Sequence, residues 1–136
     1  MDLSRTKARK IAMIILYQDL LCQKNNINTN IDELISSNVD EENEYIESIV
    51  KGVIENYNIL EESANKYLNN WTLDRLGLTD QAIILIALYE LKFASTPSLV
   101  VINEAIELSK QYSDIAVSKM INGLLDKFYH LEIEGK

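Results

Sequence analysis

The chain has 136 residues, nearly half of them apolar and a quarter charged, with only four glycines and one proline. This length suits one compact domain, and this composition excludes wholesale disorder and disfavours a turn-rich all-β fold. The net charge of −8 is unusual for a nucleic-acid-binding protein. One cysteine and one histidine exclude an intrachain disulfide and an ordinary structural zinc site, which needs about four such ligands.

The first half of the chain predicts four helices, over about residues 4–24, 30–37, 40–56 and 59–70. Some apolar residues of the first helix recur at the spacing of one helical face. Further apolar residues lie beside them and extend the apolar surface almost around the whole helix, which is typical of a helix central to a fold. Asn30 is expected to cap the second helix and Asp40 the third. Cys22 is expected to be a small buried hydrophobic residue.

The second half predicts three further helices, over about residues 79–93, 98–111 and 114–130. They follow a turn-rich joint in which Leu73–Leu76 is expected to form one helical turn. Gly77 suits the left-handed conformation that ends many helices, and Thr79 is a good N-cap for the helix that follows.

Gly123 interrupts the apolar pattern of the last helix. Because a glycine within a helix costs ~1 kcal/mol relative to alanine, we expect another element to pack closely there. The tail from Glu132 to Lys136 is expected to be frayed. The sequence predicts one all-α domain over residues 1–136, made of two small helix bundles, about 1–70 and 71–131, that share a core.

Catalytic signals are weak. His130 lies near the end of the last helix without an evident nucleophile, and a surface or capping role is favoured over general-base chemistry. Glu104 and Glu107 share a helix face, as surface carboxylates routinely do, and no glycine-rich phosphate loop is present. No signal-peptide cleavage pattern follows the N-terminus, and no apolar run approaches the ~20 residues of a membrane span, so a soluble, cytoplasmic protein is expected.

Positive charge is concentrated at the N-terminus. Residues 1–10 carry four basic side chains against one acidic side chain, a charge of +3, so the remaining 126 residues carry −11. Cations at a helix start oppose the helix dipole, and such groups bind RNA phosphates well. From charge alone, a solvated helix start remains the alternative to an RNA-binding site. The four basic residues are Arg5, Lys7, Arg9 and Lys10.

Four segments together resemble the NusB family in order and spacing and cover almost the whole chain. Within them, the N-E-A-I-E-L and I-N-G-L-L-D motifs are the most specific parts. The segments are SRTKARKIAMIILYQ (4–18), WTLDRLGLTDQAIILIALYEL (71–91), PSLVVINEAIELSKQYS (97–113) and SKMINGLLDKF (118–128).

The resemblance implies an all-helical transcription antitermination factor without enzymatic activity or cofactor. It implies binding to the boxA element of ribosomal RNA leader transcripts, jointly with the ribosomal protein NusE, and assembly into an antitermination complex on RNA polymerase. Besides the basic N-terminal segment, the family's RNA surface uses the start of the central helix and the start of the last helix. These positions are Asp80, Gln81, Lys119 and Met120 here.

The chain departs from the family pattern at several of these positions. Thr6 stands where the family is often basic, Gln81 and Leu85 where it often has arginine, and Met120 where it commonly has phenylalanine. Two other interpretations are a protein-binding helical adaptor without RNA contact and an RNA-recognition domain of the kind fused to ribosomal RNA methyltransferases, which the length of the chain disfavours. The apolar first helix is also compatible with a homodimer.

Overall fold

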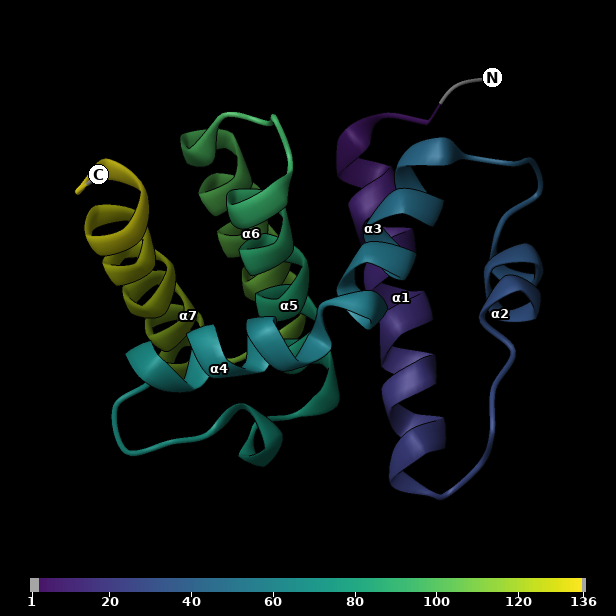
Figure 1. The fold of residues 1–136 in the computed structure, drawn as a ribbon, viewed down its shortest axis with the longest axis horizontal. Helices are drawn as coiled ribbons and strands as arrows, with labels where there is room; N and C mark the ends of the chain where they lie inside the picture. Colours follow the sequence, from purple (N-terminus) through teal and green to yellow (C-terminus); the bar gives the residue numbers. More distant parts are fainter. Residues whose placement is uncertain (1–2, 136) are drawn as a thin grey trace.

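The computed structural model describes residues 3–135, and all the regular secondary structure in that range is helical (Figure 1), which confirms the all-α prediction. None of the described helices is long and apolar enough to cross a membrane. The elements are α1 (Arg5–Lys24), α2 (Ile31–Asn38), α3 (Glu44–Glu55), α4 (Tyr57–Tyr67), the 3₁₀ turn η1 (Leu73–Arg75), α5 (Leu78–Phe93), α6 (Ser98–Tyr112), α7 (Ile115–Phe128) and the π-helical segment η2 (Tyr129–Glu134).

Helix α5 is the centre of the fold. It packs against α1, α3, α4, α6 and α7, and every side chain from Gln81 to Leu88 is buried. A helix that is apolar on all sides must be surrounded by other elements to remove that surface from water. The composition of α5 therefore requires the central position that this helix occupies.

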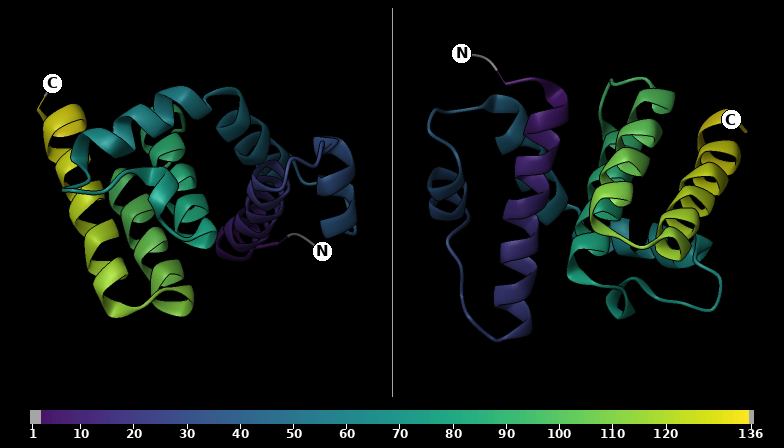
Figure 2. Two further views of the ribbon diagram at one scale, coloured as in Figure 1. Left: turned by 90° about the horizontal axis from the view of Figure 1, so that it is seen from below. Right: turned by 180° about the vertical axis from the view of Figure 1, so that it is seen from behind.

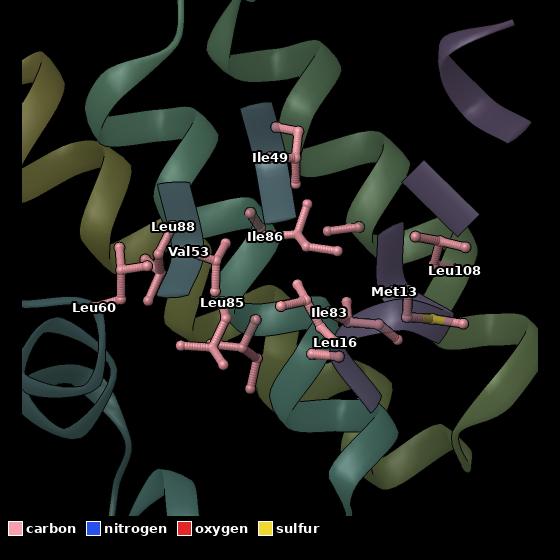
Figure 3. Close-up of a cluster of buried hydrophobic side chains, with 14 of the residues drawn as sticks. Met13, Leu16, Ile49, Val53, Leu60, Ile83, Leu85, Ile86, Leu88 and Leu108 are labelled. Atoms are coloured by element: carbon pink, nitrogen blue, oxygen red, sulfur yellow. The ribbon is translucent and has the colours of Figure 1, made fainter. Parts of the chain in front are cut away.

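One continuous core joins the N-terminal and C-terminal helices. Figure 3 shows side chains of α5 meeting residues of α1, α3, α4 and α6, namely Ile83, Leu85, Ile86 and Leu88 from α5 with Met13, Leu16, Ile49, Val53, Leu60 and Leu108. The division into bundles of about 1–70 and 71–131 stays a prediction. Helix α4 precedes residue 70 but packs on α5 and α7.

Side-chain caps fix the starts of four helices. Asn30 accepts a hydrogen bond from the backbone of Glu33, as predicted, and Asp114 accepts one from the backbone of Val117. The prediction for α3 was wrong: Asn43, not Asp40, provides the cap. Ser4 caps α1 in the same way.

The joint before α5 contains the predicted helical turn at Leu73–Arg75. Gly77, however, has a φ of −58°, so it does not adopt a left-handed conformation. The residue that does so is Asn70, with a φ of 63°. Helix α5 begins at Leu78 without a side-chain cap, so Thr79 does not have the predicted capping role.

Close packing against a helical glycine occurs at Gly52 and not, as predicted, at Gly123. Apart from the backbone of its own helix and its chain neighbours, no atom lies within 4 Å of the position of a Cβ on Gly123, so the predicted close packing there is wrong. A Cβ on Gly52 would instead meet the ring of Tyr89. Gly52 thus allows α3 to approach α5 closely.

The C-terminal tail continues as the helical segment η2 through Glu134, where the sequence predicts fraying from Glu132. The hydroxyl of Tyr67 donates a hydrogen bond of 2.5 Å to Glu132, which ties η2 to α4. Lys136 lies outside the described residues. Cys22, expected to be buried, is only half-buried.

Candidate nucleic-acid interface

Arg9, one of the four predicted RNA contacts at the start of α1, is buried with only 3% of its surface exposed. Its Nε donates to Glu90 Oε1 at 2.7 Å and its Nη2 to Oε2 at 3.0 Å. Burial by itself lowers the pKa of Arg9, but the hydrogen bonds and charge of Glu90 outweigh it and raise the pKa. Arg9 therefore holds α1 on α5 and does not present its guanidinium at the surface, which corrects the expected phosphate contact.

Glu90 organises several elements around this ion pair. The hydroxyl of Tyr45 on α3 donates to Glu90 Oε1 at 3.0 Å, and that of Thr96, after α5, lies 3.4 Å from Oε2. Burial and the negative charge of Glu90 raise the pKa of Tyr45, so the phenol stays a neutral donor. Thr6 donates to Glu104 on α6 at 2.7 Å. The first turns of α1 are thus fixed against α3, α5 and α6.

The three other basic residues are exposed but separate onto two sides of α1. The guanidinium carbon of Arg5 lies 4.3 Å from the ring centroid of Tyr45, on the α3 side. Lys10 points to the other side, with its Nζ 5.6 Å from the ring centroid of Tyr112 at the end of α6, within the range of a cation–π contact. Lys7 precedes Lys10 by about one turn on the exposed face. Figure 2, in its right view, shows α1 and α6 side by side.

The two residues at the start of α5 that were predicted to contact RNA, Asp80 and Gln81, are at least half-buried and bind other parts of the protein. Gln81 is buried, and its side chain donates to the carbonyl of Leu76 at 2.9 Å. Because that amide is engaged inside the protein, the expected RNA contact of Gln81 is not available in this structure. Asp80 is half-buried and accepts a hydrogen bond from Ser113 in the turn between α6 and α7.

The start of α7 carries the last two residues that were predicted to contact RNA, Lys119 and Met120. Lys119 is exposed, and Met120 is half-buried against the core. A groove of about 390 Å³ lies between α6 and α7, and Ile115 at its margin is 76% exposed. The groove is lined by Ile106, Lys110, Ser113, Asp114, Ile115, Ser118, Lys119 and Asn122.

We define the basic edge as Lys7, Lys10, Tyr112, Lys110 and Lys119. These residues are linked by contacts. Lys10 lies against the ring of Tyr112, and Ser113, which follows Tyr112, donates a hydrogen bond to Asp80. Ser113 also lines the groove together with Lys110 and Lys119. Sequence reasoning missed Tyr112, Lys110 and Ile115. All three lie in or beside segments quoted for the family resemblance, but the contact that joins this region to the N-terminus, between Tyr112 and Lys10, spans about 100 residues of chain.

The basic edge brings ammonium groups and an aromatic ring to one side of an otherwise acidic domain, and the exposed side chain of Ile115 lies beside them. Ammonium groups neutralise phosphates, and flat or apolar side chains contact bases. The described residues contain no cluster of three potential metal-ligating His, Cys, Asp or Glu side chains. The fold and this surface define an all-helical binding domain with an edge suited to a polyanion.

The chain belongs to the NusB family, whose model matches residues 6–130. The transcription antitermination protein NusB of Staphylococcus aureus (strain JH9) is 39% identical over 124 residues, covering 90% of this chain and 96% of the relative. The protein is accordingly a transcription antitermination factor and not an enzyme.

Solved structures agree with this assignment. NusB of T. maritima is 26% identical and superposes with a TM-score of 0.83, covering 96% of this chain and 93% of that one. A crystal structure of antitermination factors NusB and NusE in complex with double-stranded RNA contains a chain 25% identical, with a TM-score of 0.80 and coverage of 93% and 96%. The predicted fold and family are confirmed.

Proposed function

We propose that this chain binds the boxA element of ribosomal RNA leader transcripts together with the ribosomal protein NusE, and that the pair joins an antitermination complex on RNA polymerase. The observation that carries the proposal is the basic edge, on a fold that matches a NusB chain solved with NusE and RNA. The RNA lies along this edge, from the start of α1 to the start of α7.

The residues of the basic edge, and the neighbouring Met120 and Asp80, have different roles in this proposal. Lys7, Lys10 and Lys119 contact phosphates, since their side chains are exposed. Met120 and Tyr112 offer apolar and aromatic surface to unpaired bases. Asp80 acts indirectly, because it holds the turn between α6 and α7 through Ser113.

The acidic charge of the chain explains why NusE is needed for tight binding of RNA. Outside residues 1–10 the chain carries a charge of −11, which repels an approaching RNA. A basic ribosomal protein docked on this acidic surface supplies cations and reduces the repulsion. NusE then raises the affinity for RNA, and by linkage RNA raises the affinity for NusE by the same factor.

Titration calorimetry with boxA RNA, with and without NusE, tests the proposal, and a scrambled RNA of equal length is the control. The expected result is tighter binding of boxA than of the scrambled RNA, and a further increase when NusE is present. If NusE binds but RNA does not bind to the chain or to the pair, the chain is a protein-binding adaptor and the proposal is wrong.

Self-association is a separate part of the proposal. Tyr17 and Leu21 on α1 are exposed apolar side chains that favour contact between two copies when NusE is absent. Sedimentation velocity at increasing concentration tests this, and a monomer throughout the range would contradict it.

A further inference from the structure

One buried charge has no counter-charge within the described part of the chain. Residues 3–135 bury three charged side chains, Arg9, Asp19 and Glu90, of which Arg9 and Glu90 pair with each other. Asp19, in the second half of α1, is 5% exposed, and it forms no ion pair of 4 Å or less with a basic side chain of these residues. A buried charge is costly unless it is paired, so the position of Asp19 calls for a cation from outside the fold.

The hydrogen-bond partners of the Asp19 carboxylate are neutral groups. The amide of Gln23 donates to Oδ2 at 2.7 Å, and the hydroxyl of Thr29, in the loop after α1, donates to Oδ1 at 2.7 Å. A carboxylate offers about four acceptor sites, so about two remain for a further donor. The two bonds therefore fix the orientation of the carboxylate without using all of its acceptor capacity.

Asp19 lines a pocket of about 170 Å³ between α1, α3, α5 and the start of α4. Its walls are mostly aliphatic, and Figure 3 shows three of them, Leu16, Val53 and Leu85, within the core. At ~30 Å³ for each water-sized group, the pocket has room for roughly five or six non-hydrogen atoms. The lining residues are Leu16, Asp19, Leu20, Gln23, Val53, Ile54, Tyr57 and Leu85.

The polar groups of this pocket suit a cation. Gln23 donates to Asp19 through its amide nitrogen, which leaves its Oε1 as a further acceptor. The hydroxyl of Tyr57 donates to Glu61 at 3.3 Å. Burial, together with the charge of Glu61, raises the pKa of Tyr57 to about 12, so the phenol stays neutral. An aromatic ring beside a carboxylate attracts a positive charge.

The chemistry of the pocket distinguishes an organic cation from a metal ion. Ca²⁺ takes about six to eight oxygen ligands and Mg²⁺ requires an octahedral set. The residues that line this pocket include one carboxylate, and the described residues contain no group of three potential metal ligands. An alkylammonium ion instead combines three N–H donors on a charged head with a hydrocarbon chain that aliphatic walls remove from water.

We propose that this pocket binds a small aliphatic amine in its ammonium form. The ammonium group donates to the remaining acceptor sites of Asp19, and the hydrocarbon chain lies against Leu16, Val53 and Leu85. Asp19 lies about two and a half turns beyond Lys10 along α1, so the pocket is separate from the basic edge. The proposal is independent of boxA and NusE binding.

The first test uses the wild-type chain alone. Butylammonium chloride is titrated against the protein and followed by the NMR shifts of the backbone amides, and 1-butanol serves as the neutral probe of nearly equal shape. The expected result is saturable shifts around Asp19, Gln23 and Val53 with butylammonium, at concentrations about 10- to 100-fold lower than 1-butanol requires, because a hydrogen bond to a charged group is made. Potassium chloride at the same ionic strength controls for screening.

The second test is Asp19→Asn, which keeps the shape of the side chain and removes its charge. The variant is expected to bind butylammonium about 10- to 100-fold more weakly, with the response to 1-butanol unchanged. Asp126→Asn is the matched control, since it makes the same change on α7, where the Asp126 side chain is 64% exposed. Butylammonium should also raise the melting temperature of wild type and of the control, and not that of Asp19→Asn.

Three outcomes would overturn the proposal. Butylammonium that causes no saturable shifts in wild type, or shifts no tighter than those from 1-butanol, shows that the pocket does not select a cation. These two results need no variant, so they decide the matter even if Asp19→Asn fails to fold. Equal binding of butylammonium by folded Asp19→Asn and by wild type would show that Asp19 only anchors the loop after α1 through Thr29.

Discussion

Arg9 and Glu90 form a buried, two-bond ion pair between α1 and α5, with side chains only 4% and 1% exposed. A charge buried to this degree is tolerated only when it is paired and hydrogen-bonded. Tyr45 and Thr96 complete the surroundings of the carboxylate. This pair fixes the start of α1, from which Lys7 and Lys10 project.

Arg9→Met should destabilise the fold by about 3–5 kcal/mol, because the charge of Glu90 is left buried without a partner. Urea denaturation followed by circular dichroism measures the destabilisation. The double variant Arg9→Met/Glu90→Leu should be more stable than Arg9→Met alone, since the buried, unpaired carboxylate of Glu90 is gone. The second carboxylate near Arg9, that of Glu104 at 3.7 Å, is partly exposed and can be solvated. A double variant less stable than the single one would show that the unpaired charge is not the main cost.

The positions of the helices could be predicted from the sequence because apolar spacing and caps are local signals. The run Ala82–Leu88 is apolar on every side, so its central place follows from its own composition. Asn30 and Asp114 bind backbone groups three residues away, which a sequence displays directly.

The sequence could not show which of the predicted site residues are buried, because burial depends on partners far along the chain. Arg9 looks like a surface cation beside Lys10, and only its pairing with Glu90, 81 residues away, removes it from the surface. Gln81 is likewise kept from the surface, because its side chain donates a hydrogen bond to the carbonyl of Leu76 in the segment before α5. Gly123 and Gly52 look alike in sequence, yet only Gly52 faces a neighbouring ring.

The two glycines predict opposite effects of the same substitution. Gly123→Ala should stabilise the protein by about 0.5–1 kcal/mol, because alanine is the better helix former and the site is open. Gly52→Ala should instead destabilise it by about 1–3 kcal/mol, since Tyr89 must move. Parallel urea titrations compare the two. Equal changes in both variants would contradict the packing described for Gly52.

Lys7→Ala/Lys10→Ala should weaken RNA binding and flatten its salt dependence. For single-stranded RNA, the slope of log K against log salt should decrease in magnitude by about 0.7 for each phosphate that the variant no longer neutralises. Lys24→Ala/Lys127→Ala is the control, since it removes the same charge at exposed positions away from the basic edge. Equal slopes for the two double variants would remove Lys7 and Lys10 from the interface.

His130 should titrate above its ordinary pKa of 6.5, because it is hydrogen-bonded to Glu134 and lies near Asp126. The folded protein then holds the proton more tightly than the unfolded chain does. The resulting stabilisation is fully present below about pH 6.5 and is lost as the pH rises through the folded-state pKa. His130 is the sole histidine, so its NMR titration is unambiguous. Glu134→Gln should lower the pKa, and an unchanged midpoint would contradict the pairing.

Met120→Phe should increase the affinity for RNA with little change in stability. Met120 is half-buried at the start of α7, where one side of the side chain packs on the core and the other faces solvent beside Lys119. The family resemblance implies an RNA-contacting phenylalanine here, and one added stacking platform is worth ~1–3 kcal/mol.

The alternative for Met120→Phe is overpacking. If the larger ring is forced inward against Val117 and the core, stability should fall by about 1–3 kcal/mol with no gain in affinity. RNA titrations and thermal melts of the same preparation decide between the two results, with Lys119→Ala as a neighbouring variant expected to bind RNA more weakly because one phosphate is no longer neutralised. A less stable variant without tighter binding would show that Met120 belongs to the core and not to the RNA surface.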